Sequence, residues 1–395
     1  MNTIAALALA LLPAALLLAA QPPDLQHVDV YNSGEDGYAV YRIPTIEVAP
    51  DGTILAFAEA RKFNGADPGM ENNEIDLVLK RSTDGGKTWS AMQVVEHAGE
   101  RWSSANAATV VDRTTRCIWV LYLRCMPNRD TGTSRPGTDD TQTLARYSDD
   151  SGRTWSAPTD LTAIARDMKD PGWTCSVIGP GGAIQTRSGR LLFASWKATP
   201  YVPFCVFSDD HGRTWRRGGM VPGAQGGNEC QVVELAGGRI MMDVRQNDGP
   251  NRWVSYSSDG GETWSAPRPG AAVSPVACAI ERFTRMSGRE RSRIVWTGPK
   301  GPGRKTLVAR VSYDEGDTWP NERLVSDGLA TFNVDPSATK PTDPRRRTRL
   351  SAAFRCSLMT EGLHGLDLRA TTAYPGLAPD DPTYWSITAS RSGLG

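Results

Sequence analysis

The chain has 395 residues, of which 39% are hydrophobic and 22% are charged. This composition supplies enough apolar material for a large core and excludes a disordered protein. Lysine plus arginine and aspartate plus glutamate number 44 each, so the formal net charge is zero. A neutral chain gives no electrostatic reason to expect nucleic acid or an anionic membrane surface as a partner.

The first segment, residues 4–20, is an apolar run rich in Ala and Leu that is followed by Gln-Pro-Pro-Asp. This pattern predicts a signal peptide over residues 1–20, with cleavage near Ala20, and therefore an exported protein that is periplasmic or secreted. No Lys or Arg precedes the run, so a short membrane anchor is the alternative. After signal cleavage we expect no stable membrane insertion and a single domain over residues 21–395.

Five copies of one octapeptide, Ser-x-Asp-x-Gly-x-Thr-Trp, run through the rest of the chain. Neighbouring copies are 66, 60, 49 and 55 residues apart, which is too long for a helical solenoid and suits a four-stranded propeller blade. Short β-rich runs such as residues 117–124 and 190–195 lie between them. We therefore predict an all-β fold, a six-bladed propeller whose sixth blade is closed by the two termini. The copies end at Trp89, Trp155, Trp215, Trp264 and Trp319.

The octapeptide has the chemistry of a tight hairpin. Its Asp can accept hydrogen bonds from backbone amides, its Gly supplies a positive φ, and its Trp can bury a large apolar area against a neighbouring blade. The pattern is the Asp box, and five ordered copies resemble the sialidase (neuraminidase) family and the wider group of Asp-box, or BNR, propellers. We interpret the five carboxylates as structural: Asp84, Asp150, Asp210, Asp259 and Asp314.

Four arginines outside the boxes stand in contexts similar to the family's motifs. Arg42 stands in Tyr-Arg-Ile-Pro, Arg61 follows residues 56–60, Arg245 follows residues 241–244, and Arg304 precedes the Ser of the last box by eight residues. By residue type alone, each could equally be a surface arginine. The resemblance implies that Arg42, Arg245 and Arg304 bind a carboxylate and that Arg61 contacts the O4 side of the sugar. Guanidinium groups suit a sugar acid, because its carboxylate accepts bidentate hydrogen bonds.

A carboxylate follows the first two arginine motifs in a Gly-rich loop. Asp67, six residues past Arg61, resembles the family's acid/base aspartate, with Glu71 and Glu74 as nearby alternatives and a plain turn residue as the other interpretation.

Two further residues complete the implied site. Glu229 lies 16 residues before Arg245 and resembles the glutamate that deprotonates the nucleophile. Asn106 stands where the family places a substrate-facing Asn or Asp, although it could equally be a β-turn residue.

The nucleophile is missing from its expected place. Sialidases use a Tyr, and the family carries it a little beyond the last Asp box, where residues 328–334 of this chain contain none. Tyr374 is a weak candidate much further downstream. Residues 336–395 form an atypical closing segment that begins with Pro, Thr and Arg. A divergent last blade or a shifted reading frame would explain the change, and a shifted frame would leave no alternating apolar strands to close the ring.

The resemblance implies an exo-α-sialidase that removes terminal sialic acids from glycoproteins, glycolipids and oligosaccharides with retention of configuration. The alternative is a non-catalytic Asp-box propeller that binds sialylated or other anionic glycans, and a third option is a glycosidase or lyase acting on another sugar acid. None of these implies a metal or an organic cofactor. The seven cysteines and four histidines also lack metal-ligand spacing.

Overall fold

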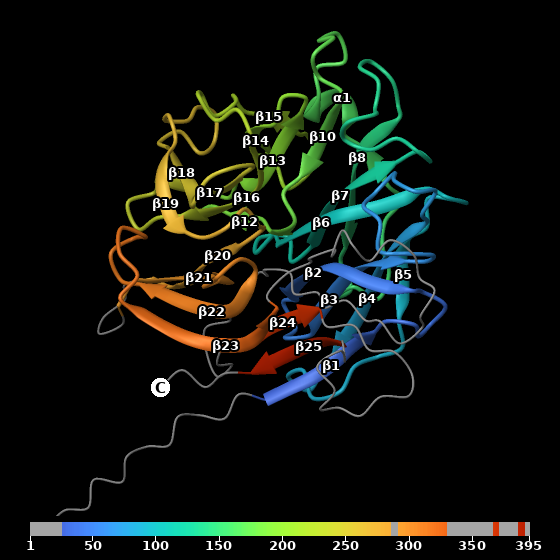
Figure 1. Ribbon diagram of the computed structural model, residues 1–395, viewed down its shortest axis with the longest axis horizontal. Helices are drawn as coiled ribbons and strands as arrows, with labels where there is room; N and C mark the ends of the chain where they lie inside the picture. The colour runs from blue at the N-terminus through green and yellow to red at the C-terminus, as the bar shows by residue number, and fades with distance from the viewer. Residues whose placement is uncertain (1–25, 286–290, 330–365, 371–385, 392–395) are drawn as a thin grey trace, which may run out of the picture.

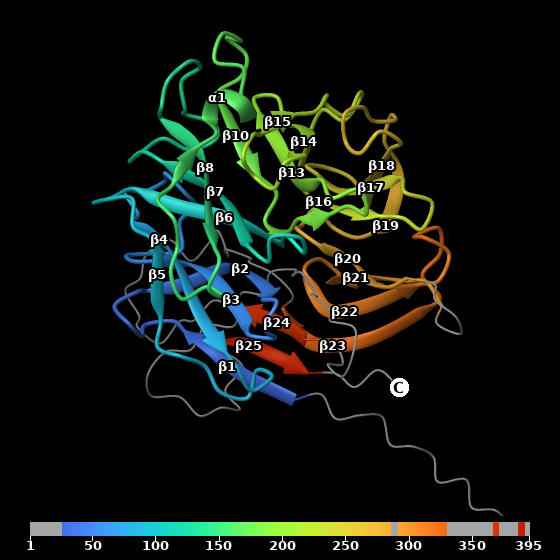
Figure 2. The ribbon, with the colours of Figure 1, turned by 180° about the vertical axis from the view of Figure 1, so that it is seen from behind.

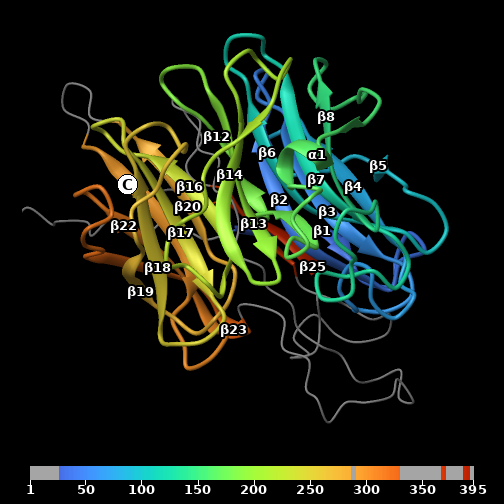
Figure 3. The same cartoon turned by 90° about the horizontal axis from the view of Figure 1, so that it is seen from above.

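The computed structural model describes residues 26–285, 291–329, 366–370 and 386–391. Its sheets are arranged as blades around a central axis (Figure 1), and the prediction of an all-β, six-bladed propeller is confirmed. Seen from above, the strands run with a tilt from one end of the ring to the other (Figure 3). The described helix α1 has four residues, Thr162–Ala165, and no described helix has the length and apolar character needed to cross a membrane.

In the first three blades the strands nearest the central axis come first in the chain. There β2 of blade 1 contacts β6 of blade 2 and β11 of blade 3. Blades 1 and 2 merge into one hydrogen-bonded sheet because Ile75 pairs with Ser103, and β11 adds to that sheet by pairing with β6. The strands of blade 1 are β2 (Val40–Val48), β3 (Ile54–Arg61), β4 (Ile75–Ser82) and β5 (Gln93–Glu96); those of blade 2 are β6 (Ser103–Val111), β7 (Ile118–Cys125), β8 (Thr141–Ser148) and β9 (Thr159–Asp160); those of blade 3 are β10 (Cys175–Ile178), β11 (Gly181–Gly182), β12 (Ile184–Gln185), β13 (Leu191–Ala198), β14 (Val202–Ser208) and β15 (Arg216–Arg217).

Blades 4 and 5 are regular four-stranded antiparallel meanders, and their inner strands contact each other. The strands of blade 4 are β16 (Gly227–Glu234), β17 (Ile240–Gln246), β18 (Asn251–Ser257) and β19 (Arg268–Ala272); those of blade 5 are β20 (Ala279–Thr284), β21 (Arg293–Pro299), β22 (Lys305–Ser312) and β23 (Asn321–Leu329).

The two ends of the chain form the sixth blade. The N-terminal strand β1 (Gln26–Asn32) pairs with β25 (Ser386–Arg391), which pairs with β24 (Leu366–Ala370), and the three lie side by side in Figure 2. Strand β24 contacts β2 of blade 1. The described part of the closing segment thus supplies two strands to the sixth blade.

Each Asp box is the turn that follows the second-to-last strand of a blade. In the first box, Ser82 donates from Oγ to Asp84 Oδ1 at 2.8 Å, and Asp84 also accepts from the Thr88 amide at 3.0 Å and the Thr88 hydroxyl at 2.6 Å. The same bonds recur in the other four boxes. All five Asp side chains are therefore occupied by their own turns, as the structural interpretation predicts.

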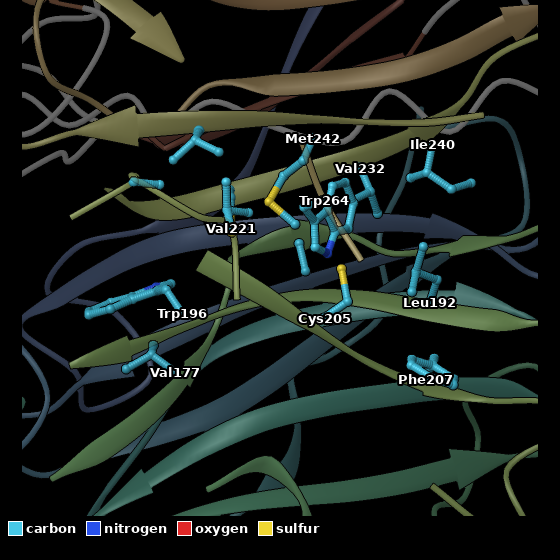
Figure 4. Close-up of a cluster of buried hydrophobic side chains, with 14 of the residues drawn as sticks. Val177, Leu192, Trp196, Cys205, Phe207, Val221, Val232, Ile240, Met242 and Trp264 are labelled. Atoms are coloured by element: carbon cyan, nitrogen blue, oxygen red, sulfur yellow. The ribbon is translucent and has the colours of Figure 1, made fainter. Parts of the chain in front are cut away.

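The box tryptophans join each blade to the one before it. Trp155 of blade 2 lies edge-on to Phe57 of blade 1, with 5.6 Å between ring centroids. Trp264 of blade 4 packs in one buried cluster with Leu192 and Cys205 of blade 3 and Met242 of its own blade (Figure 4). One aromatic side chain per repeat thus covers the face that each small sheet would otherwise expose.

We expect Trp155→Ala to lower the free energy of unfolding by about 3 kcal/mol, because it removes a large aromatic side chain from between two blades. Chemical denaturation followed by fluorescence measures this. Tyr313→Ala is the control, since that ring is 38% exposed and its loss should cost under about 1 kcal/mol. Equal stability of the two variants would contradict the inter-blade role of the tryptophan.

Candidate functional site

The predicted site residues lie at the end of the blades opposite to the Asp boxes. In blade 1, Arg61 pairs with Ile75 at the start of β4, whereas Ser82 of the box pairs with Ile54 at the far end of β3. An eight-residue strand such as β3 separates the two ends by about 20 Å. Blade 4 repeats this arrangement, because β17 pairs its last residues with the start of β16 and its first residue with Ser257 of the box.

Three of the inner strands carry a β-bulge where a predicted site residue stands. The pairing register shifts after Arg42 in β2, across Asn106 in β6 and across Glu229 in β16. Asn106 has a positive φ of 52°, which Asn tolerates better than most residues. A bulge redirects a side chain out of the regular alternation of the strand. The backbone thus interrupts its pairing at these three positions.

The structure brings Arg42, Arg61 and Asp67 together. The Nη1 atoms of Arg42 and Arg61 donate to Asp67 Oδ1 at 2.8 and 3.0 Å, and both also donate to the carbonyl of Gly65. The two arginines are buried, at 6% and 1% exposure, whereas 57% of the Asp67 side chain reaches solvent. The Asp67 carboxylate therefore contacts two buried cations, of which Arg61 has Glu59 as a second partner.

These contacts determine the protonation state of Asp67. Enclosure by neighbouring groups raises the pKa of its carboxyl, but the charges of Arg42 and Arg61 outweigh that effect and lower the pKa to about 2. Burial, followed by the charge of Arg61, lowers the pKa of Arg42 to about 10. Asp67 is consequently ionised at neutral pH in this arrangement, and it needs a change in its surroundings to carry a proton.

A second ion pair comes from blade 4. Arg245 Nη1 donates to Glu229 Oε2, and the charge of Glu229 is the main cause of the raised pKa of Arg245. Arg304, which precedes β22, donates to the Pro275 carbonyl at 2.8 Å. Burial, followed by the charge of Arg245, lowers the pKa of Arg304.

The two ion pairs belong to one electrostatic group. The charge of Glu229 acts on the pKa of both Arg42 and Arg304, and the charge of Asp67 also acts on that of Arg304. The arginines predicted to bind a carboxylate and the two predicted catalytic carboxylates therefore act on one another electrostatically, and β11 links their blades through its contacts with β2, β16 and β20. The three arginines come from blades 1, 4 and 5.

Glu59 is a site residue that the sequence analysis missed. It is completely buried, and its Oε2 accepts hydrogen bonds from Arg61 Nε at 3.1 Å and Nη2 at 2.5 Å. Its Oε1 accepts a hydrogen bond from the backbone N–H of Asn106 at 2.8 Å. Glu59 therefore connects two predicted substrate-binding residues across blades 1 and 2. A charged residue within the apolar strand of residues 54–60 was the available signal.

Glu74 and Glu71, the alternatives to Asp67 as the acid, have surroundings different from those of Asp67. Glu74 is buried and pairs with Lys62 at 2.6 Å. With Asp76 and His97 it forms a group whose ligand-type atoms lie within 4.8 Å of one another. Asp76 already accepts from His97 and from the Tyr38 hydroxyl, so hydrogen bonds within the protein account for this cluster. Glu71 is exposed on the loop.

The nucleophile is not found among the described residues. None of the eight described tyrosines donates its hydroxyl to Glu229 or lies in a hydrogen bond with Arg245. Tyr374 lies outside the described residues, as do residues 1–20 and most of the closing segment.

The chain matches the family described as BNR repeat-like domain over residues 52–380. It is also 29% identical over 323 residues to a sialidase of Bacteroides fragilis and 31% identical over 330 residues to a sialidase of Micromonospora viridifaciens. The chain belongs to the sialidase family. These alignments cover 76% and 78% of the chain but 58% and 49% of the two sialidases, so the chain spans about half the length of these curated relatives.

Solved sialidase structures share the fold. The Hadza microbial sialidase Hz136 superposes with a TM-score of 0.74 at 24% identity, covering 93% of this chain and 68% of that one. A Trypanosoma rangeli sialidase in complex with 2,3-difluoro-KDN gives a TM-score of 0.70 at 19% identity, covering 93% and 58%. At these identities the likeness to solved structures concerns the propeller alone.

We expect Arg42→Leu to raise the pKa of Asp67 above its value of about 2, because the substitution removes a cation whose Nη1 lies 2.8 Å from the carboxylate. Carboxyl-carbon NMR of the protein labelled at aspartate measures it, and the Asp67→Asn spectrum assigns the signal. Arg310→Leu is the control, since Arg310 pairs with Glu322 in blade 5. An Asp67 titration identical in the Arg42 and Arg310 variants would contradict this cause.

Proposed function

We propose that the chain is an exo-α-sialidase that hydrolyses terminal sialic acids from glycoconjugates with retention of configuration. The observation that carries the proposal is the grouping of Arg42, Arg245 and Arg304 from three blades around two carboxylates, Asp67 and Glu229. The sialidases among its relatives support the same activity. Sialylated glycoproteins, glycolipids and oligosaccharides are the corresponding substrates.

The arginine group suits the carboxylate of a sialic acid. Guanidinium groups bind a carboxylate through charge-assisted hydrogen bonds, and three of them fix its orientation as well as its charge. Arg42 and Arg245 are held by internal carboxylates in the free chain, so the site is close to electrically balanced before substrate arrives. A bound substrate carboxylate would compete with Asp67 for Arg42.

This competition would prepare Asp67 for acid catalysis. When the substrate carboxylate takes up the charge of Arg42, less positive charge acts on Asp67 and the pKa of its carboxyl rises, so that the carboxyl can carry a proton. Asp67 would give that proton to the leaving glycosidic oxygen as the bond to the anomeric carbon breaks. It would later accept a proton from the water that attacks the glycosyl-enzyme intermediate.

Glu229 would serve as the base for the nucleophile, held in place by Arg245. A neutral Tyr activated by a carboxylate approaches an anomeric centre that bears a carboxylate with less repulsion than an anion would. Tyr374 is the candidate we propose, from the sequence context around it. We further propose export through a signal peptide at residues 1–20 to the periplasm or the medium.

A second candidate function is glycan binding without turnover. It is favoured by one observation: among the described residues no tyrosine hydroxyl contacts Glu229. Release of methylumbelliferone from its sialic acid glycoside by the purified full chain tests the choice. Binding of sialylated glycans with no release would support the second function and contradict the first.

We expect Arg304→Ala to lower kcat/KM for sialosides by roughly 10- to 150-fold, because a charge-assisted hydrogen bond contributes about 1.5–3 kcal/mol. Steady-state kinetics with methylumbelliferyl sialoside measures this effect. Arg310→Ala is the control, because Arg310 lies in the neighbouring strand β22 and pairs with Glu322. A loss below about threefold for Arg304→Ala would remove this arginine from the carboxylate site.

We expect Asp67→Asn to slow the hydrolysis of sialyllactose by about 100-fold or more, since general acid catalysis typically contributes 10²–10⁴-fold. The loss on methylumbelliferyl sialoside should be much smaller, because a phenol leaves without full protonation of its oxygen. Parallel kinetics on the two substrates gives the comparison. Equal losses would count against Asp67 as the acid.

A further inference from the structure

The loop that carries Asp67 is held from inside the protein by two buried side chains. Arg61 and Asn73 are each 1% exposed, and both donate hydrogen bonds to backbone carbonyls of residues 64–66. The Ala66 carbonyl accepts from both of them. Asp67, the next residue, is the first exposed side chain of this stretch after residues 64–66.

Arg61 directs its hydrogen-bond donors into the protein. Its Nε and Nη2 donate to Glu59 at 3.1 and 2.5 Å. Its Nη1 donates to the carbonyls of Gly65 and Ala66, each at 2.7 Å, and to Asp67 Oδ1 at 3.0 Å. A guanidinium has five N–H groups in a fixed fork. With both edges engaged inside the protein, Arg61 holds the loop in place.

Asn73 uses the full capacity of its amide in the same loop. Its Nδ2 donates to the carbonyls of Asn64 at 3.1 Å and Ala66 at 3.2 Å. Its Oδ1 accepts from the amides of Phe63 at 3.2 Å and Glu74 at 3.1 Å. An Asn side chain has two N–H donors and one carbonyl acceptor with two lone pairs, so all of them are used. The amide thereby ties the two stems of the loop to its centre.

We propose that Arg61 and Asn73 are positioning residues that fix residues 64–67 and thereby set where the Asp67 carboxylate lies. The inference rests on the proposed function, in which Asp67 is the acid. Glu59 orients Arg61, because it accepts from two of its nitrogens on the side away from the loop. A general acid must stand within hydrogen-bond reach of the leaving oxygen, so loosening its loop costs rate on substrates that need the proton.

Two substrates distinguish this role from direct sugar contact. Methylumbelliferyl sialoside and sialyllactose carry the same sialic acid and differ in their leaving group. Loss of a contact to the sugar would slow both equally and would weaken binding of an unreactive analogue. Displacement of the acid would slow mainly the substrate whose leaving oxygen needs a proton.

The test compares Asn73→Ala and Arg61→Lys with the wild-type chain, and Asn251→Ala is the matched control. Asn251 also donates its amide to a backbone carbonyl, that of Gly270, but it lies in blade 4 away from the loop. Lysine keeps the charge beside Glu59 and lacks the fork that reaches the loop carbonyls.

For both loop variants we expect kcat/KM on sialyllactose to fall at least tenfold more than on methylumbelliferyl sialoside. For Asn73→Ala the Kd for 2-deoxy-2,3-didehydro-sialic acid should stay within threefold of wild type, and the control should leave the ratio of the two rate constants unchanged. Equal losses on the two substrates, or a large rise in that Kd, would overturn the positioning role.

Hydrogen exchange of the peptide over residues 62–73 supplies a readout that needs no activity. We expect its amides to exchange at least tenfold faster in Asn73→Ala than in wild type or in Asn251→Ala, and unchanged exchange would overturn the proposal. If Asn73→Ala does not fold, Asn73→Asp keeps the volume without the two donors and replaces it. If the wild-type chain hydrolyses neither substrate, the proposed function has failed and hydrogen exchange alone decides the positioning role.

Discussion

The packing of one Asp-box tryptophan against the preceding blade is the interaction on which the ring depends. Each blade is a small sheet that cannot bury both faces by itself, so neighbouring blades must be held at a fixed spacing. Polar contacts reinforce the same junctions: His211 of the third box lies 2.8 Å from the buried Asp112 of blade 2, and Arg190 of blade 3 pairs with Glu262 of the fourth box. The boxes hold neighbouring blades together at one end, and the predicted site arginines lie at the other.

At the end of the blades opposite to the Asp boxes, three of the site arginines are paired with carboxylates. Buried cations are costly unless paired, and the structure pairs the buried Arg61 and Arg42 and the partly buried Arg245 each with a carboxylate. Arg61 has Glu59, Arg42 has Asp67, and Arg245 has Glu229. These partners differ in exposure: Glu59 is sealed inside, whereas Asp67 is mostly exposed. A sealed partner is suited to holding its arginine, and an exposed partner can be replaced by an incoming anion.

The repeat and the order of the motifs were sufficient to predict the fold and to choose residues that the structure brings together. The octapeptide spacing predicts blades because a local turn sets each one. The sequence could not reveal that Arg61 donates its hydrogen bonds to Glu59 and to the loop of residues 64–67, or that Asn73 is buried beside that loop. Burial and hydrogen-bond partners are decided by tertiary packing. His211 and Asp112, 99 residues apart, are joined for the same reason. The position of the nucleophile stays a prediction, since Tyr374 lies outside the described residues.

The pairing of β1 with β25 has a consequence for how the chain reaches its native state. The partners Gln26 and Arg391 stand at opposite ends of the sequence, so their contact closes a loop of roughly 360 residues. Blades 1 to 5 can each form from neighbouring segments, but the ring cannot close until the last strand has been made. During synthesis β1 therefore stays an unpaired edge until the end of the chain is made. A chain that loses its final residues leaves that edge open to pair with another molecule.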